Sequence, residues 1–194
     1  RSMPPWRFDL RYRGRYSRPA GLIYDAFTDE PYPAGHLCRR FEVPWDWKRH
    51  LGLDFGGVHT AGTFWAEDPQ TGYLYGYREY LAGDMTTEEH ARALCSGEPK
   101  FALACGGSWS EDQWRREFKR AGIDVKRPDI SDVNVGIDRV YGGFKERKVF
   151  MFDDLTGLRK ELREYSRKLG SDGEPIDVIE HKERYHLLDA TRYI

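Results

Sequence analysis

The order of strand and helix patterns along the chain restricts its fold more than any other feature. Three strand-like runs follow one another at residues 51–55, 61–67 and 73–81, and the short segments between them are rich in turn-forming residues. This succession predicts a three-strand antiparallel meander. Beyond it, helices and strands alternate, which is typical of a mixed α/β sheet with helices on both faces.

Capping residues and apolar spacing mark the later elements. Thr86, with Glu89 three residues on, predicts the start of one helix. A second helix is expected over residues 110–122, with Ser110 as its N-cap and Gly122 at its end. The remaining helices are expected at residues 133–144, 155–169 and 184–194, and the remaining strands at residues 101–105, 123–126, 149–152 and 176–179.

Residues 1–50 differ from the rest of the chain. They are rich in Pro, Tyr and Arg, and hold only short strand-like pieces at residues 7–12 and 21–26. We interpret them as an irregular lead-in that packs on a single domain formed by residues 51–194. Because the chain enters strand-like sequence directly from Arg1 without an initiator Met, we expect it to be a fragment of a longer protein.

Composition excludes several classes of protein. With 31 Lys and Arg against 32 Asp and Glu, the chain is not polybasic. It has no run of 18 apolar residues and no apolar signal-peptide core, so no membrane association is expected. Its three cysteines form no CxxC pair, and we expect ordinary buried thiols. Without a GxxxxGK[ST] loop, the chain is not itself an ATP-driven motor.

Isolated carboxylates are the candidate functional residues. Asp54 interrupts an apolar strand, where an unpaired charge is costly; the alternative is a strand-end Asp bonded to the following glycine turn. Asp189 shares a helix face with His186, and the alternative is a solvated surface pair. Glu111 and Asp112 begin a helix, where acids are favoured by the helix dipole, and at most one of them can face a common site.

Three carboxylates on separate elements are what a two-metal phosphodiesterase site needs. Their oxygens would hold two Mg²⁺ or Mn²⁺ ions, one of which activates water while the other stabilises the leaving 3′ oxygen. No histidine and cysteine spacing typical of zinc competes with this interpretation.

The sequence resembles the C-terminal nuclease domain of the large terminase subunit of tailed phages, a DNA-packaging protein. The resemblance covers almost the whole chain, and its most specific motif is His186-Leu-Leu-Asp-Ala-Thr-Arg-Tyr193. It implies a ribonuclease H-like fold, with Asp54 as the first-strand metal ligand and Asp189 as the last-helix ligand. Many family members have an acid at the end of the fourth strand, where this chain has Cys105-Gly106-Gly107. The nearest acid is Glu111, which we therefore assign as the middle metal ligand, with Asp112 as the alternate.

The function that the resemblance implies is a metal-dependent endonuclease that cuts concatemeric double-stranded phage DNA during packaging. Asp54, Glu111 and Asp189 would be both catalytic residues and metal ligands, with His186 in a supporting role. The implied partners are double-stranded DNA, the ATPase domain of the same protein, the portal and the small terminase subunit, in the cytoplasm of the infected bacterium.

DNA binding needs positive charge, and residues 115–127 supply it. This segment contains six Lys and Arg and only two acidic residues. The candidate phosphate contacts on the predicted helix are Arg115, Arg116, Lys119 and Arg120. The alternative for each is a solvated helix face.

Two other functions stay open. The chain could be a module that docks to the portal or motor, with weak or regulated nuclease activity, through the aromatic residues Trp6, Tyr12, Tyr16 and Tyr24. It could less readily be an actin-like nucleotide-binding lobe, since such proteins need two lobes and this length supplies one.

Overall fold

The computed structural model describes residues 20–56, 58–108, 110–130 and 132–194. A six-stranded sheet with the order β1-β6-β4-β3-β2-β5 runs through the centre of this part of the chain. Its strands are β1 (Leu37–Cys38), β2 (Lys48–Phe55), β3 (His59–Glu67), β4 (Leu74–Gly83), β5 (Leu103–Gly106) and β6 (Val149–Phe152). β2, β3 and β4 pair antiparallel, whereas β5 and β6 join them in parallel. The predicted mixed sheet with a three-strand meander is confirmed.

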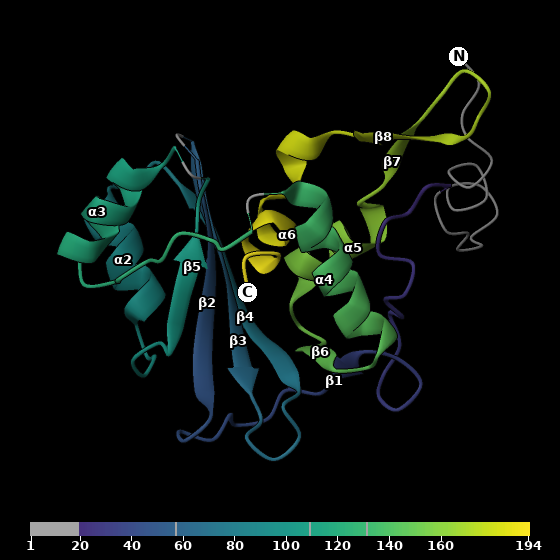
Figure 1. Ribbon diagram of the computed structural model, residues 1–194. Coiled ribbons are helices and arrows are strands. Elements are labelled where there is room, and N and C mark those ends of the chain that lie inside the picture. The colour runs from purple at the N-terminus through teal and green to yellow at the C-terminus, as the bar shows by residue number, and fades with distance from the viewer. Residues whose placement is uncertain (1–19, 57, 109, 131) are drawn as a thin grey trace.

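Helices cover both faces of the sheet (Figure 1). On one side lie α2 (Thr87–Cys95) and α3 (Asp112–Arg120); on the other lie α4 (Val133–Lys145), α5 (Thr156–Glu164) and α6 (His186–Thr191). A hairpin of β7 (Arg167–Leu169) and β8 (Pro175–Ile179) projects from the body, and the 3₁₀ turn η1 (Lys182–Arg184) leads from it to α6. Among the described helices, none has the length and apolarity that crossing a membrane requires.

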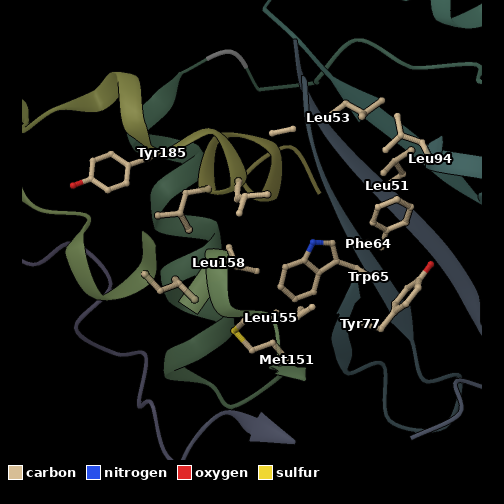
Figure 2. Close-up of a cluster of buried hydrophobic side chains, with 14 of the residues drawn as sticks. Leu51, Leu53, Phe64, Trp65, Tyr77, Leu94, Met151, Leu155, Leu158 and Tyr185 are labelled. Atoms are coloured by element: carbon tan, nitrogen blue, oxygen red, sulfur yellow. The ribbon is translucent and has the colours of Figure 1, made fainter. Parts of the chain in front are cut away.

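The core lies on both sides of the sheet because side chains alternate along each strand. Figure 2 shows Trp65 of β3 directed toward Met151 and Leu158, whereas the neighbouring Phe64 lies on the opposite side, near Leu51. All five side chains are buried. Two packed layers of helix therefore enclose the meander that carries Asp54.

Several predicted element boundaries are confirmed, and others are wrong. Thr86 and Glu89 form the predicted capping box at the start of α2. Helix α3 begins later than predicted, because Glu111 and not Ser110 occupies its N-cap position. Residues 123–126 form no full strand; Lys126 makes a single parallel bridge with Cys105.

The predicted helix over residues 155–169 ends at Glu164. Tyr165 adopts an extended conformation, and the following residues pair with other segments: Ser166 bridges Leu22, and β7 pairs with β8. The predicted final helix is also shorter, because Tyr185 leaves helical geometry between η1 and α6.

The lead-in contributes to the core. Residues 21–26 are turns and not the predicted strand, yet Tyr24 is only 1% exposed and packs against Phe144. Tyr24 is therefore a core residue and not part of a docking surface. The predicted strand at residues 7–12, and Trp6, Tyr12 and Tyr16, lie outside the described residues. The division at residue 50 stays a prediction, and β2 crosses it.

All three cysteines are free thiols. Cys105 is buried and Cys38 is partly buried, but Cys95 is exposed at the end of α2, so the prediction of buried thiols is wrong for Cys95.

Candidate active site

Asp54 lies near the end of β2, on the face that α6 covers. Side-chain alternation puts Gly52 on the same face, where a Cβ atom would collide with the carbonyl oxygen of Ala190. The glycine therefore lets α6 approach β2 closely. As a result, Nδ1 of His186 lies 2.9 Å from Oδ2 of Asp54, and the ring N–H donates to the carboxylate.

Helix α6 also carries Asp189, one turn after His186. Its Oδ1 accepts a hydrogen bond of 2.8 Å from Nε of Arg192, and both side chains are largely buried. Arg192 comes directly after α6 and three residues after Asp189, a spacing at which two side chains can meet on one side of a helix. The second predicted carboxylate is thus held beside Asp54 with its charge partly balanced.

The loop between β5 and α3 brings in Glu111. Gly107 begins this loop with a φ of 73°, and its backbone N–H donates to the carbonyl of Leu53 in β2. The Glu111 carboxylate turns back and accepts a hydrogen bond of 2.5 Å from the backbone N–H of Ser108. The loop therefore sits against the end of β2, next to Asp54.

The three predicted carboxylates, Asp54, Glu111 and Asp189, line one pocket of about 250 Å³. Burial raises the pKa of Asp54 to about 6; the His186 hydrogen bond opposes this rise, and the charges of Asp189 and Glu111 add to it. Burial is the main cause of the raised pKa of Asp54, and the charges of the two other carboxylates in the pocket lining act in the same direction.

Oxygen donors of this kind suit Mg²⁺ or Mn²⁺, and a divalent cation would offset the repulsion at Asp54. Within the described ranges, however, no three His, Cys, Asp or Glu side chains already form a metal-holding group. Asp54 faces His186 instead, and Asp189 faces Arg192. The donor set fits a divalent ion in chemistry and location, and its carboxylates are engaged with protein partners.

Asp112 and Arg115 lie apart from the pocket lining. Arg115 and Arg127 both bond to Asp112 at 2.7 Å and hold the pKa of its carboxyl below the usual range. Arg115 is buried and also donates to the carbonyls of Gly106 and Ser108, both at 2.9 Å. Its contacts fix the loop that carries Glu111.

The other predicted DNA-binding residues are exposed on α3. These are Arg116, Lys119 and Arg120. Lys119 lies 3.3 Å from Asp124, which reduces the charge it presents.

Two glutamates whose roles the sequence did not indicate, one buried and one half-buried, cap the starts of helices α6 and α5. Glu161 of α5 accepts hydrogen bonds from the backbone N–H groups of Leu187 and Leu188, so its carboxylate caps the start of α6. Burial raises the pKa of Glu161 to about 7. Glu79 of β4 caps α5 in the same way, at 2.8 and 2.7 Å. No local pattern marks either residue, because their partners are distant in sequence.

No family model and no curated protein matches this sequence, but solved structures do. The large terminase of a thermophilic bacteriophage matches with a TM-score of 0.74 and 22% identity, over 96% of this chain and 47% of that one. The P22 large terminase nuclease domain matches with a TM-score of 0.69 and 18% identity, over 91% of this chain and 92% of that one.

The nuclease domain of the SPP1 large terminase, solved with bound Mn, matches with a TM-score of 0.61 and 19% identity, over 77% of this chain and 85% of that one. The chain thus spans about half the length of the thermophilic phage's large terminase and most of the length of the separate nuclease domains. These likenesses establish the architecture: this chain has the ribonuclease H-like fold of the nuclease domains of bacteriophage large terminases.

Proposed function

We propose that this chain is the nuclease domain of a phage large terminase, a metal-dependent endonuclease that cuts concatemeric double-stranded DNA during packaging. The observation that carries the proposal is the meeting of Asp54, Glu111 and Asp189 at one pocket, from three separate elements. The shared fold supports it, as does the Mn bound in the SPP1 nuclease domain.

Asp54, Glu111 and Asp189 would hold two Mg²⁺ or Mn²⁺ ions, which when bound supply water activation and stabilisation of the leaving oxygen. The chain's other residues position these ligands. His186 orients Asp54 by its hydrogen bond, and Arg115 fixes the loop that carries Glu111. Glu111 is favoured over Asp112 as the middle ligand, because Glu111 lines the pocket, whereas Asp112 does not and is bound by two arginines.

DNA would be held through its phosphates by the exposed basic face of α3. Arg116 and Arg120 are exposed and follow Glu111 on the same helix, and Lys119 contributes less because of Asp124. Arg115, being buried, is assigned to the loop and not to DNA. Phosphate contacts carry no sequence information, which suits cleavage with little sequence preference.

One proposed partner, the ATPase domain, is inferred from the length of this chain relative to the large terminase that it resembles in structure. Because it spans 47% of the thermophilic phage's large terminase, we propose that the ATPase domain of the same protein accompanies it. The portal, the small terminase subunit and the cytoplasm of the infected bacterium remain predictions from the sequence resemblance.

The proposal is tested with purified chain and supercoiled plasmid. We expect nicked and linear products with Mn²⁺ or Mg²⁺, and none in EDTA, because the carboxylates alone cannot activate water. Cleavage that persists in EDTA, or no cleavage with either metal, would contradict the proposal. Portal binding without cleavage would favour the docking module instead.

A further inference from the structure

We propose that Lys182 binds a backbone phosphate of DNA at the mouth of the carboxylate pocket and so positions the strand for cleavage. This inference rests on the proposed nuclease function and names a contact that the α3 residues do not supply. Lys182 lines the same pocket as Asp54, Glu111 and Asp189, but it comes from the segment between β8 and α6 (Figure 1).

Lys182 differs from the other cation that lines this pocket, Arg192. The Arg192 side chain is only 6% exposed, pairs with Asp189, and lies over the Tyr193 ring at 5.0 Å from its centroid. Lys182 is exposed, and among the described residues it has no carboxylate partner. Arg192 therefore balances a protein charge, whereas the Lys182 ammonium is available to a ligand.

The backbone around Lys182 is anchored on both sides. On one side, the N–H of Glu180 donates to the carbonyl of Ser166 at 2.9 Å. On the other, the N–H of Tyr185 donates to the carbonyl of Lys182, and the buried Tyr185 ring packs edge-on against Tyr165 at 4.9 Å. The position of Lys182 relative to α6 is thus fixed while its side chain extends into solvent.

A phosphate is the ligand that this arrangement favours. Three carboxylates repel an approaching phosphodiester, and a lysine at their edge supplies a compact positive charge that binds phosphate oxygens. Glu111, the N-cap residue of α3, lines the pocket from the loop after β5, whereas Lys182 lines it from η1, just before α6. A DNA strand whose phosphate is bound by Lys182 would therefore lie beside the carboxylates.

The test compares Lys182→Gln and Lys182→Arg with wild type, and uses Lys100→Gln as the matched control. Lys100 is an exposed lysine that precedes β5, at the end of that strand away from Gly107. Binding of a short fluorescent DNA duplex is measured in EDTA by anisotropy, between about 50 and 200 mM salt. Cleavage rates with Mn²⁺ are measured separately.

For Lys182→Gln we expect the slope of log K against log salt to fall by about 0.9, the value for one lost phosphate contact. Cleavage should fall several-fold, and Lys182→Arg should retain both properties. The inference would be overturned if Lys182→Gln kept the wild-type salt slope. It would also be overturned if Lys182→Arg or Lys100→Gln lost as much of the salt slope as Lys182→Gln. If wild-type chain neither binds nor cuts DNA, the proposed function itself fails, and this inference with it.

Discussion

Replacing Asp54 with Asn is expected to lower Mn²⁺-dependent plasmid cleavage by roughly 100-fold or more. A metal ion supplies several kcal/mol of transition-state stabilisation, and each 1.4 kcal/mol corresponds to about a tenfold change in rate. Asp54 lines the pocket with Glu111 and Asp189, so its replacement removes one of the three proposed metal ligands. The measurement is the initial rate of plasmid cleavage at saturating Mn²⁺.

The control for this variant is Asp46→Asn, an exposed position just before the opposite end of β2. Asp46→Asn should cleave at the wild-type rate. The melting temperature of Asp54→Asn should be equal to or above that of wild type, because the substitution removes a largely buried charge without changing the side-chain volume. Wild-type cleavage by a folded Asp54→Asn chain would refute the metal-ligand role.

Replacing Glu161 with Gln is expected to flatten the pH dependence of stability. Burial raises the pKa of Glu161 from 4.5 to about 7, so the folded chain holds this proton more tightly than the unfolded chain. The stabilisation that comes from protonated Glu161 is complete below the pKa of this carboxyl in the unfolded chain. It is lost as the pH rises through its pKa in the folded chain. Between about pH 5 and pH 8 the loss amounts to about 2 kcal/mol, from 1.36 kcal/mol for each pKa unit.

Urea unfolding at these two pH values measures the effect. The Glu161→Gln chain should lose about 2 kcal/mol less than wild type as the pH rises, since the amide does not ionise. The control is Glu164→Gln, an exposed residue on the same helix, which should keep the wild-type dependence. An identical pH dependence in wild type and Glu161→Gln would show that this carboxyl is not perturbed in the folded chain.

Most strands of the sheet could be predicted because each of them is marked by a pattern within its own stretch of sequence. A short apolar run interrupted by Asp54 marks β2, a strand-like run bounded by turn-forming residues marks β3, and the Thr86 capping box marks α2. The end of α5 was not predictable, because apolar residues at helical spacing continue through Tyr165. The chain leaves the helix there to pair with Leu22 and β8, and such long-range pairing overrides local preference.

In the candidate site, too, residues marked by a local pattern could be predicted, whereas residues whose role depends on distant segments could not. Asp54 and Asp189 stand out in sequence because each carboxylate falls within an apolar pattern. Glu161 does not, because a glutamate on an amphipathic helix is typical of a solvated face. Its role depends on the backbone of α6, 26 and 27 residues away. Lys182 escapes notice for a similar reason, since only the folded chain brings η1 to the carboxylate pocket.

A crystal structure of this chain grown with Mn²⁺, with anomalous scattering recorded near the manganese edge, tests the central claim most directly. The proposed function predicts manganese in the pocket, bound by oxygens of Asp54, Glu111 and Asp189. A pocket free of manganese at concentrations that support cleavage, or manganese held by Asp112 in place of Glu111, would contradict it.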